Sequence, residues 1–546
     1  MMKLATINSA RNSVSRLTSR ERAPSIWLAQ LSQLIKHEAR LRLRRVSTLV
    51  TLLAVMAISW TLVPDPKSDM TLMTINNARA LYTSSTLALG SAALASILFG
   101  FGGFFLVRGR VAEDLRCGLG AVIATTPMQN GRMIFSRWLG GVAYLTLLVL
   151  GLLCTTLVCH ALRGEGPIQI FVYLQTYAFL LLPLIFFSAA CAVLFDCVPI
   201  LMGKFGDFVF FLIWTMQLGM MTAFDMAAKG ATPIFLMLDF FGVASSLTGL
   251  GEQFHTTSIS LGMTDFNAQL APIRLPDFLW SASMINVRFG AALLALSPLL
   301  PAAYLFHRYS PDRVVATRAR PRRSPLTVVN RWLRPLSKCA QPIMQWGMAH
   351  PHHAGQIAAE VALTLMSAPS AILVILVSTM ATLLSPQQAL PTILGLALAY
   401  WGILISDIST RDYQVQLEKL TTSVRGGAMG QLSRQLCCKL ILAGLFMGAV
   451  CVRWLLHEPL RAVALLAGVI CISAIADVLG RCVKTPRLFL ALFLFALYVA
   501  LNVRDLPLID IVGFNGVANS TSIAFYFALS LAALIGNFAF SRWKHT

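Results

Sequence analysis

The sequence has too few charged residues to cover a soluble domain. Only 12% of its 546 residues are charged and 57% are hydrophobic, whereas soluble domains usually carry about 25% charged residues. A soluble protein of this length could bury a core, but it would still need a polar surface to face water. The composition therefore excludes a soluble globular protein and indicates a membrane protein.

The sequence also lacks the motifs of nucleotide binding and of hydrolysis. No phosphate-binding loop is present, because Gly203-Lys204 lacks the leading glycine and the following hydroxyl residue. Neither His-Glu-x-x-His nor Gly-x-Ser-x-Gly occurs. We therefore predict that the chain is not an enzyme, needs no cofactor and does not bind nucleotide through such a loop. The eleven cysteines form no obvious pair in an outer loop, so no disulfide framework is expected.

What the sequence does have is a series of apolar runs of about 17–25 residues, the length needed to cross a bilayer as a helix. They fall near residues 46–63, 82–107, 139–159, 168–195, 208–227, 284–306, 361–384, 388–406, 435–452, 460–479, 488–503 and 522–541. We predict an all-α fold, a polytopic transmembrane helical bundle of about twelve helices built as a 6+6 pseudo-repeat. The predicted parts are a basic leader with an amphipathic connecting helix (1–45), two six-helix halves (46–306 and 361–546) and a basic linker (307–360).

Basic residues flank these runs unevenly and predict the orientation of the chain. The 307–350 segment holds nine basic residues against a single acid, Asp312, whereas acids outnumber bases in the 228–283 loop. By the positive-inside rule, the linker and both termini are cytoplasmic and the 228–283 loop is outside, in a cell membrane, most simply a bacterial inner membrane. The net charge of +21 then indicates attraction to anionic lipid rather than to nucleic acid.

The two halves resemble each other after their second predicted span. Thr125-Thr126, Gly131 and Met133 recur 296 residues later, and Ser136-Arg137 recurs at an offset of 297 as Ser433-Arg434. The fourth span of each half also ends in an aspartate, Asp196 and Asp477. We interpret these matches as a degenerate internal repeat.

Two predicted inner loops, 108–137 and 407–434, are far longer than a connection between two helices requires. Each has an apolar stripe at helical spacing: Val111, Leu115, Leu119 and Ile123 in the first, and Tyr413, Leu417, Leu420 and Val424 in the second. The charged positions lie off the stripe, at Arg110, Glu113, Asp114, Arg116, Arg411, Asp412, Glu418 and Lys419. Such a helix would seat its stripe against the spans and present its charges to the cytoplasm. The 26–45 segment has a similar stripe and predicts an interfacial helix that anchors the chain, contacts a cytoplasmic partner, or does both.

The first of these loops resembles the type-2 family of ATP-binding-cassette exporter permeases, in the pattern Glu113–Gly118, Ala124–Pro127 and Ser136–Gly140. The six-span unit, the amphipathic helix before it and the enlarged loop between spans five and six also fit. The resemblance implies an exporter subunit whose loops are coupling helices that dock on two separate ATPase subunits. The charged positions given above would make those contacts. The second half departs from the pattern, since Ser423 stands where the first half has Pro127 and only a short segment separates its last two spans.

Other membrane classes fit less well. A twelve-helix secondary transporter shares the 6+6 plan, but its loop between helices two and three is compact, and an acid in mid-span would be expected for ion coupling. An import permease would carry a different loop motif, and an intramembrane hydrolase would need the motifs that are missing. The transported substrate is not indicated by any motif.

Some polar residues are predicted within or beside the spans. Asp225, Arg288, Asp196 and Asp477 all lie near span ends, where a charge reaches the interface at little cost, so we expect interface anchors rather than buried groups. His350, His352 and His353 form a short histidine tract. No cysteine or acid stands close to it in sequence, so no metal site is predicted there.

Overall fold

The computed structural model describes most of the chain. The described residues are 32–33, 35–38, 40–42, 46–65, 70–116, 118–125, 129–222, 233–256, 258–277, 280–306, 325–350, 352–414, 427–483, 485–502 and 506–543. They form two compact units, one of Met1–Met202 with Phe208–Arg320 and one of Gly203–Asp207 with Pro321–Thr546. The division at Arg320 falls inside the stretch that the sequence predicted as a linker.

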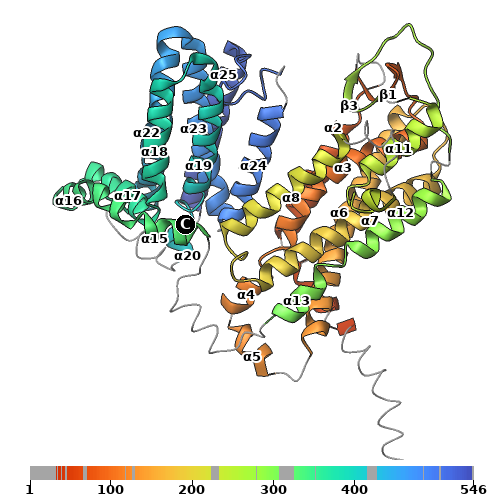
Figure 1. The fold of residues 1–546 in the computed structure, drawn as a ribbon, viewed down its shortest axis with the longest axis horizontal. Helices are drawn as coiled ribbons and strands as arrows, with labels where there is room; N and C mark the ends of the chain where they lie inside the picture. The colour runs from red at the N-terminus through yellow and green to blue at the C-terminus, as the bar shows by residue number, and fades with distance from the viewer. Residues whose placement is uncertain are drawn as a thin grey trace, which may run out of the picture. The chain divides into compact units, whose positions relative to one another are not determined.

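The first unit is a bundle of long apolar helices (Figure 1). Its helices are α2 (Val46–Leu62), α3 (Ser84–Val107), α4 (Arg110–Arg116), α5 (Leu119–Thr125), α6 (Asn130–Arg163), α7 (Ile170–Cys197), α8 (Lys204–Thr222), α10 (Pro233–Met237), α11 (Val243–Phe254), α12 (Ala282–Leu294) and α13 (Leu299–Leu305). The described residues among 32–42 are also helical, and we call them the leading helix. The core lies between α3, α6 and α7, where small residues let the helices approach closely. A Cβ atom on Gly141, for example, would lie 2.8 Å from Val107.

A three-stranded sheet covers one end of this unit, which we call the sheet end. Strands β1 (Met70–Ile75), β2 (Ala78–Arg79) and β3 (Ile259–Asp265) pair in the order β2-β1-β3, and both pairs are antiparallel. Asn76 and Asn77 form the tight turn between β1 and β2 with φ values of 51° and 60°, a conformation that asparagine tolerates. The sheet joins the segment after α2 to the predicted 228–283 loop. This link was not predicted, because neither segment alternates regularly.

Arg288 of α12 is buried within the helical bundle of this unit. Its guanidinium donates to four carbonyl groups, those of Phe179, Leu180, Asp239 and Phe240. Pro183 lies inside α7 and has no N–H to offer, so it leaves the carbonyl of Phe179 without its helical partner. Arg288 Nε supplies that partner at 2.8 Å. The arginine therefore satisfies backbone groups that would otherwise be stranded in an apolar interior.

The second unit is also helical (Figure 1). Its elements are α15 (Pro325–Trp332), η1 (Arg334–Ala340), α16 (Gln341–Ala349), α17 (His353–Ser367), α18 (Ser370–Leu384), η2 (Gln387–Ala389), α19 (Leu390–Ile405), α20 (Arg411–Gln414), α22 (Gly427–His457), α23 (Pro459–Val483), α24 (Pro486–Asn502) and α25 (Ser520–Trp543). The predicted span 361–384 is not continuous, because α17 and α18 meet at an angle of 97°. The break falls at Ala368-Pro369. A residue before proline is pushed out of the helical region, which explains the break.

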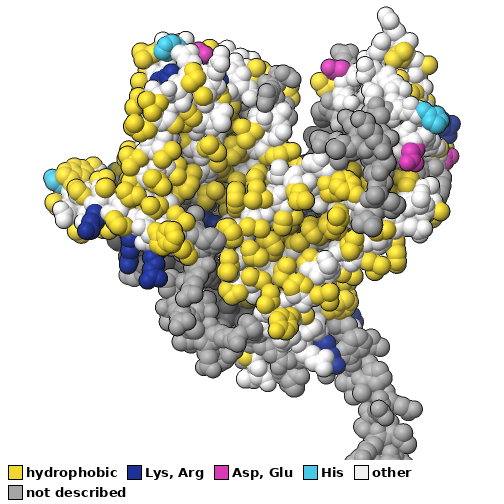
Figure 2. Space-filling model, viewed as in Figure 1, with side chains coloured by type: hydrophobic (Ala, Val, Ile, Leu, Met, Phe, Trp, Pro, Cys, Tyr) yellow, Lys and Arg dark blue, Asp and Glu magenta, His cyan; other side chains and the backbone are white. Residues whose placement is uncertain are grey.

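The fold is all-α and membrane-spanning, with its helices gathered into bundles. Among the described residues, eight helices are long and apolar enough to cross a membrane, or nine if the bent pair is one span. Two further apolar helices, Thr48–Leu62 and Pro486–Asn502, are shorter. The total of about twelve spans stays a prediction. Figure 2 shows hydrophobic side chains over the flanks of the helices in each unit, as expected where the solvent is lipid.

The expectation that the polar residues of the spans act as interface anchors was wrong for three of the four. Asp196, Arg288 and Asp477 are 5%, 1% and 0% exposed. Each has a hydrogen-bonding partner inside its unit, which offsets part of the cost of burying a charged group. Asp225 lies outside the described residues.

Candidate partner-docking site

The end of the first unit opposite the sheet carries α4 and α5, which make up most of the first predicted loop. A single amphipathic helix was expected there, but the structure has two short helices. Gly118 separates them with φ +74°, a backbone conformation that favours glycine. The apolar stripe is therefore split between two helices, and its residues need not lie on one continuous surface.

Arg110, the first residue of α4, is the hub of an ion-pair network. Its guanidinium lies 3.3 Å from Glu38 of the leading helix, 3.2 Å from Glu113 and 3.4 Å from Asp114. Burial lowers the pKa of Arg110, but Glu38, Asp114 and Glu113 raise it by more, so the pKa lies above its usual value and the group stays charged. Through this residue the leading helix and α4 are held together.

Asp114 corrects the expectation that every charged position of this loop faces solvent. It is 2% exposed and forms an ion pair with Arg137 of α6, in addition to its contact with Arg110. The side chain of Glu113, one position earlier, is 37% exposed. The two carboxylates therefore have different roles, since Asp114 joins α4 to α6, while Glu113 is partly exposed and pairs with Arg110 of its own helix.

Asp196, near the end of α7, holds the turn between α3 and α4. Its Oδ2 accepts from the backbone N–H of Gly109 at 2.9 Å and lies 3.5 Å from that of Val111. Its Oδ1 lies 3.9 Å from Arg108 Nε. Gly109 has φ +101°, so the turn itself depends on glycine. The start of α4 is thus tied to α7 as well as to α6 and the leading helix.

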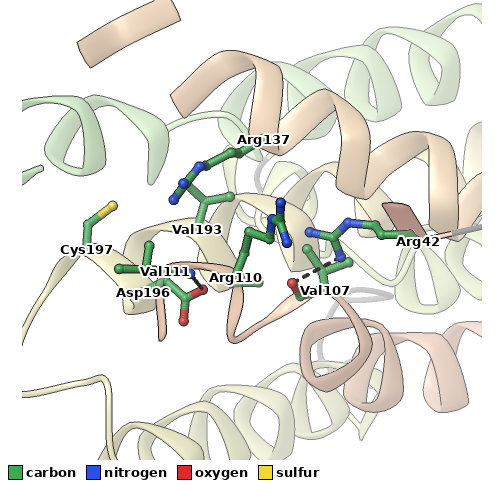
Figure 3. Close-up of a pocket in the computed structure, with 9 residues that line it drawn as sticks. Arg42, Val107, Arg110, Val111, Arg137, Val193, Asp196 and Cys197 are labelled. Atoms are coloured by element: carbon green, nitrogen blue, oxygen red, sulfur yellow. Dashed lines mark hydrogen bonds between the residues drawn. The ribbon is translucent and has the colours of Figure 1, made fainter. Parts of the chain in front are cut away.

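These groups surround a small pocket at this end of the unit (Figure 3). Its lining residues are Arg42, Val107, Arg110, Val111, Arg137, Ala192, Val193, Asp196 and Cys197. Figure 3 shows Arg42 reaching the carbonyl of Val107 and Asp196 reaching the backbone of Val111. Arg110, Arg137 and Asp196 all have carboxylate or backbone partners of their own. We therefore interpret the pocket as part of an anchoring network and not as a ligand site.

In contrast to α4, α5 presents apolar side chains outward. Leu119 is 46% exposed and Val122 is 62% exposed, while Ile123 is half-buried. Leu119 was expected to seat the helix against the spans, so this part of the stripe prediction was wrong. A pair of exposed aliphatic side chains on an anchored segment suits contact with another surface.

The second unit repeats this plan with other residues. Arg411, the first residue of α20, donates to Thr364 Oγ1 of α17 at 3.3 Å, much as Arg110 contacts Glu38. Asp412 accepts from Gln431 at the start of α22, much as Asp114 pairs with α6. In each half, then, a short helix after the second span is tied to the helix before the first span and to the start of the third.

The fourth span of this unit also supplies its anchor. Asp477 of α23 accepts from Ser409 Oγ at 2.7 Å and forms an ion pair with Lys439 of α22. Ser409 lies just before α20, as Gly109 lies just before α4. Both charged side chains, Lys439 and Asp477, are fully buried. Asp196 and Asp477 therefore have corresponding positions, in line with their match in the sequence, but Asp196 accepts from backbone N–H groups and Asp477 from side chains.

The remaining predicted positions are less informative. Arg116 ends α4, but its side chain is not among those described, and Glu418 and Lys419 lie outside the described residues, as does most of the second predicted stripe. The histidines of the tract have separate contacts. His350 stacks on Trp346, and His353 lies 3.1 Å from Ser433. Within the described part of the chain no group of three or more potential metal ligands is present.

Sequence reasoning missed Glu38, although it noted the helix on which the residue stands. From the sequence, Arg137 was recognised only as part of a repeated pattern, and Asp196 was expected at the interface. The available signal was the repetition itself, since Arg137 and Asp196 both belong to positions that recur in the second half.

The chain matches no family model, no curated protein and no solved structure.

Proposed function

We propose that this chain is the membrane-spanning permease subunit of an ATP-driven exporter, with α4–α5 and the segment around α20 as docking sites for separate ATPase subunits. It would lie in the cell membrane, in bacteria the inner membrane, with both termini and both docking segments cytoplasmic. The proposal rests on the resemblance in the sequence and on one structural observation. This is the anchoring of α4 to the leading helix, α6 and α7 beside an exposed apolar α5.

A docking segment of this kind has two requirements. It must offer a surface to the partner, and it must be joined to the spans firmly enough to transmit the partner's movement. Leu119 and Val122 meet the first requirement, and the contacts of Arg110, Asp114 and Asp196 meet the second. The matching contacts of Arg411, Asp412 and Asp477 support two such segments in one chain, and hence two ATPase subunits.

Docking is tested by placing a charge on the apolar surface of α5. Val122→Asp is expected to reduce co-purification of an ATPase encoded beside this chain's gene by about tenfold or more, since a charge in an apolar contact is costly. ATP turnover of the pair in reconstituted membranes should fall with it. Leu270→Asp is the matched control, because Leu270 is also exposed, at 44%, but lies in the loop after β3. If the wild type and Val122→Asp bound the ATPase equally well, α5 would be excluded as the docking site. ATP hydrolysis by the purified chain alone would contradict the proposal that a separate ATPase subunit hydrolyses ATP.

Sidedness is tested with single cysteines in a chain freed of its own. A membrane-impermeant thiol reagent added to intact cells is expected to label Ala268→Cys, in the exposed loop after β3, and not Gln129→Cys, just before α6. Permeabilised cells should label both, which controls for reactivity. Labelling of Gln129→Cys in intact cells would reverse the orientation and exclude cytoplasmic docking on α4–α5.

An ion-coupled secondary transporter is the second candidate. The buried pair Lys439–Asp477 favours it, because ionisable groups within membrane spans often carry protons or ions. The two candidates differ in energy source. Transport by vesicles that hold a proton gradient but no ATP would support the carrier.

A further inference from the structure

The segment from Pro325 to Ala349, made of α15, η1 and α16, precedes the first span of the second unit and has no acidic residue. Its basic residues Arg331, Arg334 and Lys338 are all exposed. Such a charge pattern repels other basic surfaces and attracts anionic ones.

One side of this segment is fixed to the rest of its unit. Asn330 accepts from the backbone N–H of Ser370, at 3.1 Å, and from its hydroxyl, at the start of α18. Gly347 of α16 lies so close to α17 that a Cβ atom there would be 2.7 Å from the carbonyl oxygen of Gly355. The segment is therefore a packed part of the unit and not a loose connection.

The segment also carries large apolar side chains that remain partly or largely exposed. The exposed ones are Val328, Val329, Trp332, Ile343, Trp346 and Met348. Trp332 is 79% exposed. Tryptophan is the residue most typical of the membrane–water interface, where its ring meets the acyl chains and its N–H meets water.

The direction of the segment fits such a surface. The 97° bend between α17 and α18 turns α17, and α16 packed on it, away from the direction of the spans. In Figure 2 the hydrophobic side chains of α16 and α17 continue onto the flank of α18, and basic side chains lie beside them. An apolar surface that joins the lipid-facing flank of a span and has exposed bases beside it suits a bilayer interface better than a protein partner.

We propose that the Pro325–Ala349 segment is a binding surface for acidic phospholipids. In this arrangement it lies flat in the headgroup layer, with Trp332 and Trp346 at the level of the upper acyl chains. Arg331, Arg334 and Lys338 contact the phosphates. This inference does not depend on an ATPase partner, and its test uses the full chain alone.

The test uses a local probe. Cys339 is exposed and lies within η1, so a chain with Cys339 as its sole cysteine can carry a fluorophore there. In nanodiscs, quenching is compared between phosphatidylglycerol and phosphatidylcholine that carry the same nitroxide on the acyl chain. We expect both lipids to quench the label and phosphatidylglycerol to quench it more strongly.

Removal of the charges gives the decisive comparison. Each base near an anionic surface contributes roughly a fivefold gain in binding. The triple variant Arg331→Gln/Arg334→Gln/Lys338→Gln should therefore lose the preference for phosphatidylglycerol, while Arg331→Lys/Arg334→Lys should keep it. A label at Gln387→Cys, past the other end of α18, should show no dependence on these substitutions. Because the three bases are exposed, both variants are expected to fold, as gel filtration can verify.

Two results would overturn the proposal. A Cys339 label that neither lipid quenches would mean that the segment lies away from the bilayer. A preference for phosphatidylglycerol that persists in the triple variant would mean that these three bases do not recognise the headgroups.

Discussion

Asp114→Lys is expected to abolish stable folding of the chain, while Glu113→Lys leaves it folded. Asp114 is buried between Arg110 and Arg137, so a lysine there would bring three positive charges together, with only the two carboxylates that already pair with Arg110, Glu38 and Glu113, to offset them. Removing one partner of a buried pair costs about 3–5 kcal/mol, and reversing its charge costs more. Glu113 is partly exposed, and water screens its contact with Arg110.

The comparison is made on detergent-purified protein, by yield, by gel filtration and by the temperature of unfolding. Asp114→Asn serves as an intermediate, because the amide keeps the shape of the side chain and loses only the charge. It should remain folded but unfold at a lower temperature than the wild type. If Asp114→Lys unfolded at the wild-type temperature, this would contradict the conclusion that Asp114 forms a buried ion pair with Arg137.

The second large effect is expected at Lys439 and Asp477. Asp477→Leu leaves a buried ammonium group that keeps its hydrogen bond to Ser409 but loses the carboxylate paired with it, and Lys439→Met leaves a buried carboxylate. Each single substitution should destabilise the chain by about 3–5 kcal/mol. The double variant should be far more stable than either, because two apolar side chains need no counterion in a packed helical interior.

This double-mutant cycle also bears on function. If the pair only joins α22 to α23, the double variant should regain transport together with stability. If the pair carries a proton, the double variant should be stable and inactive. Strict additivity of the two single effects would indicate that Lys439 and Asp477 do not interact.

The sequence predicted the helical class and most span positions because lipid-facing and buried helices are both apolar, and composition alone reveals such runs. It did not predict the break at Pro369 between α17 and α18, since a proline is also tolerated inside a span, as Pro183 is in α7. The sheet of β1, β2 and β3 was missed for another reason. Its strands come from segments almost 200 residues apart, and neither carries a strand pattern of its own.

The sequence predicted helical segments in the two inner loops, and α4, α5 and α20 lie there, but it did not predict which of their side chains are buried. Helical periodicity separates apolar from polar positions, and it treats Glu113 and Asp114 alike because both lie off the stripe. What separates them is the position of Arg137, which stands on another helix. The same limit applies to Glu38 and Asp196, whose partners stand on other segments and come close through tertiary packing.

The four carbonyl groups around Arg288 have a consequence for the order in which the chain is made. The span that contains α12 has a mean hydropathy of 1.5, the lowest of the eight. An arginine opposes the insertion of a span by roughly 2.5–3.5 kcal/mol at mid-bilayer. Its acceptors at Phe179 and Leu180 are synthesised earlier, on α7. During translation, Arg288 of α12 can therefore form these hydrogen bonds as it inserts only if α7 is still beside the insertion channel. Retention of α7 would thus become a step in the biogenesis of the first unit.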